Sequence, residues 1–294
     1  GSTSTAGNGS DDGSGVGSGG TGVSASASAV GSVDGMGSII VSGVRYNIDK
    51  IDQAMVDLRD TVGTDWQLGM TVEVTGPVDA EFATGTATKL KSMAQMRGEV
   101  VSVASTPGSA TGTISLLGTT VNVDDETVWA DLPGLASLLP GTQVQVWALP
   151  VAPGLVQATR IETQAVTGPV LVTGMISGLD SANSTFQLGG LTVNYNAATL
   201  PADALVDGRI VRVTATAGPA GGLVYASQVE AWYALSKVKD APVQVEGVIA
   251  DYTAKASPFK LLGVTIDGSS APVTGGQESK LNNGVRVVAS GVLS

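Results

Sequence analysis

The sequence predicts an all-β protein: a tandem array of four small five-stranded OB-like Greek-key barrels, the last of which lacks its fifth strand. Three observations lead to this prediction. Glycine supplies 40 of the 294 residues, about twice its usual share, while only 14% of the residues are charged. Apolar and polar residues alternate with a period of two, as in a sheet with one wet and one buried face. Finally, one pattern recurs four times along the chain.

The repeat has three landmarks in a fixed order. The first is a glycine inside a short apolar strand, the second opens a Gly-x-x-apolar stretch, and the third opens a similar stretch after a longer gap. Residues 98, 118 and 141 are the landmarks of the second copy, and successive copies are spaced by 67 to 76 residues. The glycines are Gly31, Gly98, Gly174 and Gly247; Gly43, Gly118, Gly190 and Gly263; and Gly69, Gly141, Gly208 and Gly284.

The second copy illustrates the expected elements. Strands are predicted at 97–104, 112–117, 119–124, 142–149 and 155–163. The long connection before the fourth strand holds residues 131–139, enough for one or two helical turns before Pro140 and Gly141 end them. Residues 51–58 are a similar amphipathic stretch in the first copy.

Five antiparallel strands with a helical insert between the third and fourth have the element order of the OB-fold, a small closed Greek-key barrel. Closure also removes the exposed strand edges that Val-rich strands would otherwise present. The alternative is a sandwich of two sheets built from each pair of copies, which a unit of about 70 residues suits less well.

The chain divides into a flexible Gly/Ser tether and four units. The first 22 residues are almost all Gly, Ser, Thr, Asn and Asp, which cannot offset the entropy lost on ordering. The boundaries are 1–22 for the tether, 23–94 for unit 1, 95–167 for unit 2, 168–240 for unit 3 and 241–294 for unit 4.

Unit 4 is expected to be incomplete. Units 2 and 3 carry final strands at 154–161 and 222–229, whose counterpart in unit 4 is the short stretch 291–294. The missing strand would leave an open edge for a strand from elsewhere. Residues 23–30 alternate as a donor strand must, although residues 27–30 are also expected to begin the first strand of unit 1.

The stretches at 19–24, 33–46, 57–59, 68–76 and 84–88 resemble the opening of exported bacterial lipoproteins built from repeats of domain-of-unknown-function family 5666. The other units resemble the generic repeat of that family. The resemblance implies export to the cell surface or the medium, commonly with a lipidated cysteine ahead of a Gly/Ser tether. That cysteine is absent from this sequence. The resemblance carries over no activity and no catalytic residues, and a membrane is implied only through a lost lipid anchor.

Composition excludes much enzyme chemistry. The sequence has no histidine and no cysteine, which removes thiol nucleophiles, the usual zinc and haem ligands and histidine acid–base catalysis. The net charge is −11, carried mainly by units 1 and 2, so nucleic acid is not an expected partner. We predict no enzyme, no cofactor, and no catalytic, cofactor-binding or metal site.

We interpret the remaining candidate catalytic or metal-binding residues as surface or linker residues. The acidic cluster of unit 1 and the run in unit 2 lack the spacing of a calcium loop or of a glycosidase pair, and we interpret them as solvated surface. The adjacent Ser-Lys pairs lack the Ser-x-x-Lys spacing, and we interpret them as linker. The residues are Asp49, Asp52, Asp57, Asp60 and Asp65; Asp124, Asp125 and Glu126; and Lys91, Ser92, Ser236 and Lys237.

The four tryptophans, Trp66, Trp129, Trp147 and Trp232, do not recur at aligned positions, which favours packing between units over a ligand platform. We therefore expect a non-enzymatic, extracytoplasmic structural or interaction protein of the bacterial surface. A sharper version is head-to-tail self-assembly by strand donation into unit 4. The alternative is a carbohydrate-binding surface lipoprotein, with a neutral polysaccharide as the partner that fits the charge best.

Overall fold

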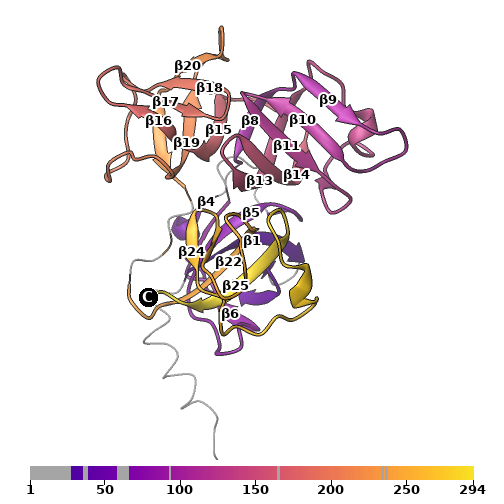
Figure 1. Ribbon diagram of the computed structural model, residues 1–294, viewed down its shortest axis with the longest axis vertical. Helices are drawn as coiled ribbons and strands as arrows, with labels where there is room; N and C mark the ends of the chain where they lie inside the picture. The colour runs from indigo at the N-terminus through magenta and orange to yellow at the C-terminus, as the bar shows by residue number, and fades with distance from the viewer. Residues whose placement is uncertain are drawn as a thin grey trace, which may run out of the picture.

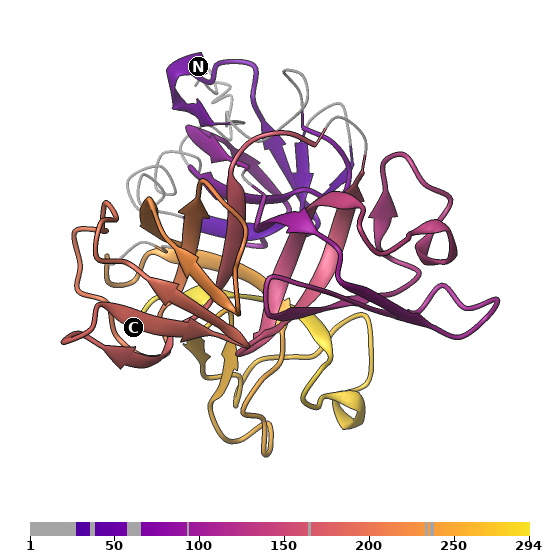
Figure 2. The ribbon, with the colours of Figure 1, turned by 90° about the horizontal axis from the view of Figure 1, so that it is seen from above.

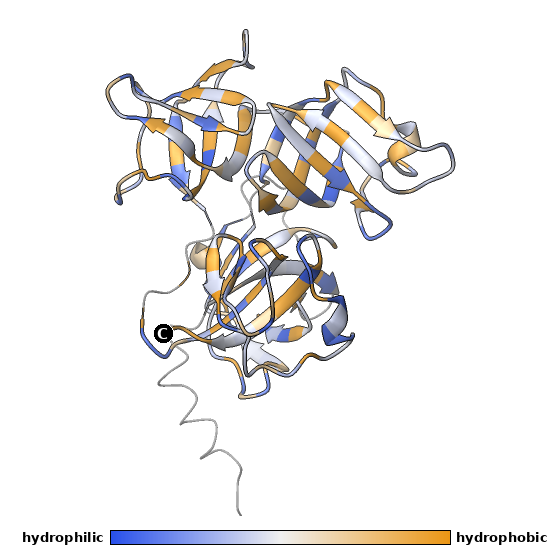
Figure 3. Ribbon diagram, in the orientation of Figure 1, coloured by the Kyte–Doolittle hydropathy of each residue, from blue (hydrophilic) through white to orange (hydrophobic). Residues whose placement is uncertain are grey.

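The computed structural model describes residues 28–35, 39–57, 66–92, 94–163, 166–232, 235 and 238–294. These residues form 25 strands and three short 3-10 turns, which confirms the all-β prediction. Apolar and polar residues alternate along the strands, as Figure 3 shows. Such a strand presents one face to an apolar interior and the other to its surroundings.

Unit 2 shows the plan of one unit. Its strands are β8 (Met96–Glu99), β9 (Ser102–Ser105), β10 (Gly112–Leu116), β11 (Thr119–Val123), β13 (Gln143–Ala152) and β14 (Leu155–Glu162), with the short β12 (Val128–Trp129) beside β14. The neighbours run β8-β13-β14-β11-β10-β9, and β11·β14 is the parallel pair of this series. Since β8 and β9 are successive pieces of the predicted first strand, the series of paired strands begins and ends with that strand. The fifth strand thus lies between the third and the fourth.

Units 1 and 3 repeat this pairing order. In each, a first strand pairs with the second and fourth, and the fifth strand pairs first with the third and then with the fourth. Unit 1 contains β1 (Ser28–Gly35), β2 (Ile39–Val41), β3 (Val44–Asn47), β4 (Val56–Asp57), β5 (Thr71–Thr75), β6 (Thr84–Thr86) and β7 (Lys89–Lys91). Unit 3 contains β15 (Val170–Met175), β16 (Ser177–Asp180), β17 (Thr185–Leu188), β18 (Leu191–Asn194), β19 (Ile210–Ala215), β20 (Leu223–Tyr225) and β21 (Gln228–Ala231).

The turn between the second and third strands explains two of the glycine landmarks. In unit 2, Leu117 and Gly118 both have positive φ, at 52° and 69°, as a tight hairpin requires. The Leu117 side chain then lies over Gly98 of the first strand, where an added Cβ would stand 3.0 Å from Leu117 Cδ1. The landmark glycines therefore let the hairpin fold back onto the first strand.

The helical inserts have the smaller of the expected lengths, one turn rather than two. Each is a single 3-10 turn: η1 (Gln53–Met55) in unit 1, η2 (Leu135–Ser137) in unit 2 and η3 (Glu278–Lys280) in unit 4. Gly134 precedes η2 and Pro140-Gly141 follows it, so the segment between these helix breakers is too short for a second turn.

The units stack in two pairs (Figure 1). Units 2 and 3 join through the antiparallel pair β8·β15, and units 1 and 4 join through a parallel pair between β1 and β22 (Pro242–Val248). Figure 2 shows the four units gathered about one centre. Side chains cross between the pairs there, because Trp147 packs into the apolar cluster of unit 1 and Leu149 into that of unit 4.

Unit 4 contains β22, β23 (Phe259–Leu261), β24 (Val264–Ile266) and β25 (Arg286–Val292). The sequence alignment of residues 291–294 with a fifth strand is wrong. Gly291 and Val292 belong to β25, where they pair with Val243 and Pro242. Gly291 follows Gly284 by only seven residues and so still lies within the fourth strand, whereas Gly154 follows Gly141 by thirteen.

Candidate functional site

The two outer edges of β24 and β25, which we call the seam, distinguish unit 4 from the other units. Among the described residues, β24 pairs only with β23 and β25 only with β22. In units 1 to 3 the corresponding place is filled by β6 with β7, by β14, and by β20 with β21. The seam is thus the one position of the repeated plan where no described strand lies.

A groove lies at one end of the seam, beside the start of β25. Its volume is about 480 Å³, and it lies between the 272–277 loop, η3 and the start of β25. The β25 side of the groove carries Val285, Val287 and Val288 together with Arg286. Val288 is 45% exposed and Val292 is 65% exposed. Exposed valines on a strand edge are what strand addition would cover.

The backbone of β25 directs hydrogen-bonding groups into the seam. Ile249 N donates to Val285 O, and Leu293 N donates to Ala241 O, so the odd-numbered residues face β22. In an antiparallel ladder alternate residues turn their N–H and C=O to opposite sides. Arg286, Val288, Ser290 and Val292 therefore point these groups away from β22 and toward the seam.

A polar cluster lies where units 1 and 4 meet. Glu246 in β22 is 5% exposed. Its carboxylate accepts hydrogen bonds from Ser32 N at 2.9 Å and from Ser42 Oγ at 2.5 Å in unit 1. Arg286 donates from Nε to Glu246 Oε1 at 2.7 Å and from Nη2 to Ser32 Oγ at 2.9 Å. The buried charge is therefore paired and hydrogen-bonded, as burial requires.

A pocket of about 400 Å³ opens beside this cluster, lined by residues from units 1, 2 and 4. Asp34 lines it, and burial together with the charge of Glu246 raises the pKa of the Asp34 carboxyl. Glu126 of unit 2 reaches Arg286 Nη1 at 3.5 Å. Because Glu246 already accepts several hydrogen bonds and an ion pair, the arrangement is suited to joining units rather than to proton transfer.

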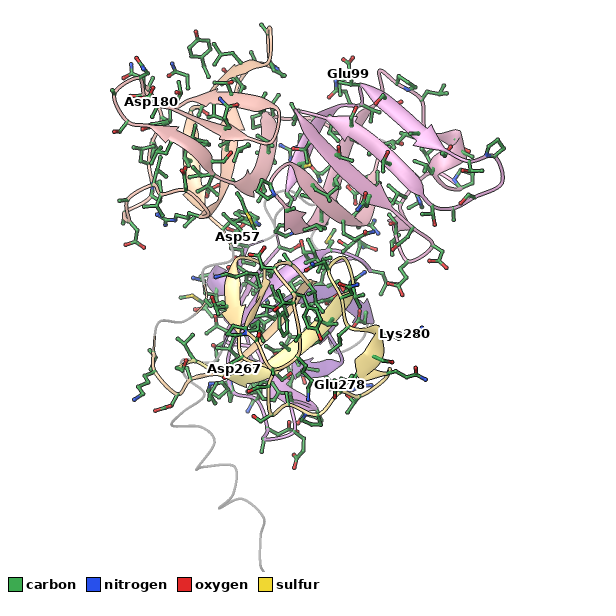
Figure 4. The ribbon with its side chains drawn as sticks, in the orientation of Figure 1. Asp57, Glu99, Asp180, Asp267, Glu278 and Lys280 are labelled. Atoms are coloured by element: carbon green, nitrogen blue, oxygen red, sulfur yellow. The ribbon has the colours of Figure 1, made fainter. Side chains whose placement is uncertain are left out.

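The acidic residues of the sequence analysis lie apart. Asp52 caps η1 by accepting from Ala54 N at 2.9 Å, and Asp124 closes a turn by accepting from Glu126 N at 3.0 Å. Asp49 is exposed, Asp57 lies in β4, and Asp60 and Asp65 fall outside the described residues. Figure 4 labels carboxylates on all four units, and they lie at separate places. In the part of the chain that the structure describes, no group of three or more acidic side chains could hold a metal ion.

The side chains of Ser92 and Lys91 contact different partners. Ser92 is fully buried and its hydroxyl donates to Thr71 O at 3.1 Å, while Lys91 Nζ lies 4.8 Å from the ring centre of Trp232. Ser236 and Lys237 fall outside the described residues. No described helix is long and apolar enough to cross a membrane.

The tryptophans pack between and within units. Trp147 is fully buried against unit 1, and Trp232 is 6% exposed in the cluster that includes unit 4. Trp66 packs against the unit 1 cluster and Trp129 against the cluster of units 2 and 3. These positions agree with packing, and Trp66 and Trp129 stay partly exposed.

Glu246 and Arg286 are not among the residues that the sequence singles out. Both lie in stretches that alternate like any other strand. One signal was present: the residue before the first-strand glycine is Arg97 in unit 2 and Glu246 in unit 4, and both side chains reach a neighbouring unit.

Residues 97–162 and 173–230 match the family described as a domain of unknown function, DUF5666. The two matches fall on units 2 and 3. They therefore cover the generic repeats, and not the stretches of unit 1 on which the resemblance was first noted. No curated protein and no solved structure matches the chain.

Proposed function

We propose that this chain is a non-enzymatic, extracytoplasmic structural or interaction protein of a bacterial surface, which assembles head to tail when unit 4 receives a β-strand at the seam. The seam carries the proposal, because three copies of the same plan fill this position and the fourth offers exposed valines and outward-facing backbone groups there.

The finer description of each unit belongs to the same proposal. We propose that units 1 to 3 are OB-like Greek-key barrels. The support is the order first-second-third-fifth-fourth-first, with the third and fifth strands parallel in all three units. Unit 4 would be the same barrel, which would close when a further strand occupies the seam.

The proposal is tested by the association of the full chain in solution. Size-exclusion chromatography with light scattering, and electron microscopy, should show species that grow with concentration. Such growth is expected because a heterologous contact that does not close gives open chains. A strictly monomeric protein at all accessible concentrations would overturn the proposal.

A single proline substitution can distinguish the seam edge of β25 from the edge that pairs with β22. Val288 N points toward the seam, so Val288→Pro should block strand addition while leaving the β22·β25 ladder in place. The matched control is Val287→Pro, which removes a bond to β22 and should unfold unit 4. Association that survives Val288→Pro in a folded protein would exclude the seam.

A further inference from the structure

The fifth strands of units 1 to 3 share a short signature. Each contains an alanine followed by threonine or serine, and these alanines, Ala87, Ala158 and Ala226, are 2%, 0% and 5% exposed. The hydroxyl that follows always donates to a carbonyl of the fourth strand. The contacts are Thr88 Oγ1 to Thr75 O at 3.0 Å, Thr159 Oγ1 to Trp147 O at 3.1 Å and Ser227 Oγ to Thr214 O at 3.1 Å.

The acceptor carbonyl has a fixed place in the repeat. It belongs to the residue six positions after the glycine that opens the fourth strand, namely Gly69, Gly141 or Gly208. The same count from Gly284 gives Ser290. Ser290 is one of the β25 residues whose carbonyl points into the seam, so unit 4 presents the acceptor without a described partner strand.

The position two residues before the alanine also has a fixed neighbour. Val156 pairs with Val121 of the third strand in unit 2, and Val224 pairs with Val193 in unit 3. The residue at the same place in the third strand of unit 4 is Ile266, which is half-buried. An incoming strand should therefore carry an apolar or small residue beside Ile266 and an alanine two residues later.

We propose that Val23-Ser24-Ala25-Ser26 of a second copy occupies the seam, in the register of the native fifth strands. This segment has the same order as Val224-Tyr225-Ala226-Ser227, although it lies outside the described residues. Val23 would lie beside Ile266, Ala25 would face the interior, and Ser26 Oγ would donate to Ser290 O. The proposal rests on the strand-accepting function proposed above and names its partner.

The donor must come from another molecule because the segment cannot reach its own seam. Gln244 of β22 pairs with Ala29 of β1 on one side and with Ser290 on the other. The donor position beyond β25 is thus three strand spacings from Ala29, or about 14 Å. Ser26 is three residues from Ala29, and three extended residues span at most about 11 Å.

The structure also shortens the donor segment that the sequence suggests, residues 23–30. Residues 28–30 pair with β5 on one side of β1 and with β22 on the other. They cannot be donated without opening both ladders, so the donor ends before residue 28.

Alternation within the donor supplies a matched pair of full-length variants. Ala25→Asp places a carboxylate on the inward face and should weaken association about tenfold or more, because the charge would be buried without a partner. Ser24→Asp adds the same charge on the outward face and should change association less than about twofold. Equal effects of the two variants would overturn the assigned register.

A disulfide trap gives an independent readout in a chain that has no cysteine. Lys89 lies opposite Thr75 in unit 1, and the equivalent pair across the seam is Ala27 with Ser290. Ala27→Cys with Ser290→Cys should give a ladder of covalent oligomers under oxidising conditions, whereas Ala27→Cys with Arg286→Cys, out of register, should not.

The outcomes separate the two proposals. Association that requires the β25 edge but is not captured by the cysteine pair, and is equally unaffected by both aspartates, would overturn the donor and leave strand acceptance standing. A peptide of residues 21–27 should compete with association, and a scrambled peptide should not. Absence of association in the unmodified chain overturns both proposals.

Discussion

The two joints between paired units differ in strand direction and in whether their apolar clusters merge. Units 2 and 3 join through antiparallel strands, and their apolar residues merge into one cluster. Units 1 and 4 join through parallel strands, keep separate apolar clusters, and place Glu246 and Arg286 between them. One repeated plan therefore supports both a fused hydrophobic interior and a polar joint.

Two positions in the repeat contribute to this difference between the joints. The residue before the first-strand glycine is Arg97 in unit 2, whose Nη1 donates to Pro169 O of unit 3 at 3.1 Å. In unit 4 it is Glu246, which reaches Ser32 and Ser42 of unit 1. Ser42 stands where units 2 and 4 have Leu117 and Leu262, so the joint gains a hydroxyl where those two units have a leucine.

The largest expected effect is at the contact between the two pairs. Trp147→Ala should lower the free energy of unfolding by about 3–5 kcal/mol, because a fully buried indole would leave a cavity between units 1 and 2. Urea unfolding followed by circular dichroism measures the change. Leu139→Ala, at a side chain that is 67% exposed, is the control and should change it by less than about 0.5 kcal/mol.

The joint between units 2 and 3 depends on close glycine contacts. Gly189 has φ of 56°, and an added Cβ would stand 2.6 Å from Gly154 Cα and 2.7 Å from Gly118 O. Gly189→Ala should therefore cost about 2–4 kcal/mol. Gly208→Ala, where φ is also positive but nothing lies within 4 Å, should cost only about 1–2 kcal/mol. Equal losses in thermal unfolding would contradict a role for the close approach.

The joint between units 1 and 4 depends on its ion pair. Glu246→Gln should lower stability by about 2–3 kcal/mol, less than a fully buried pair would lose, because the Arg286 side chain is 25% exposed and water can reach it. Glu278→Gln breaks an exposed pair with Lys255 and should cost less than about 1 kcal/mol. Hydrogen exchange of β1 and β22 would show whether the loss is local to this joint.

The smallest effect concerns Asp34. Its pKa is raised in the folded protein by burial and by Glu246, so ionised Asp34 opposes folding at pH values above its folded pKa. Below pH 3.8, the carboxyl is protonated in both states and the penalty vanishes. Asp34→Asn, which can still accept from Gly43 N, should stabilise the protein slightly at pH 7 and not at pH 3. A gain of equal size at both pH values would contradict this origin.

The sequence predicted much of each unit and little of how units meet. The strands of unit 2 were expected within about three residues of their observed ends, because alternation and turn glycines are local signals. Pairing between units is not local, and β1 and β22 are more than 200 residues apart. Glu246 and Arg286 could not be told from solvated charges, since only the assembled fold brings Ser32 and Ser42 against them. The open edge of unit 4 was foreseen, but Gly291 was assigned to the wrong strand.

The pairing of β1 with β22 decides how tension would pass through the molecule. A pull applied at residue 28 and residue 294 is transmitted along β1, β22 and β25, which are adjacent in one sheet. Units 2 and 3 lie outside that line and would bear no load until the β1·β22 contact yields. A single molecule pulled from these two positions would therefore lengthen first by rupture of the β1·β22 contact, after which the middle of the chain would be drawn out.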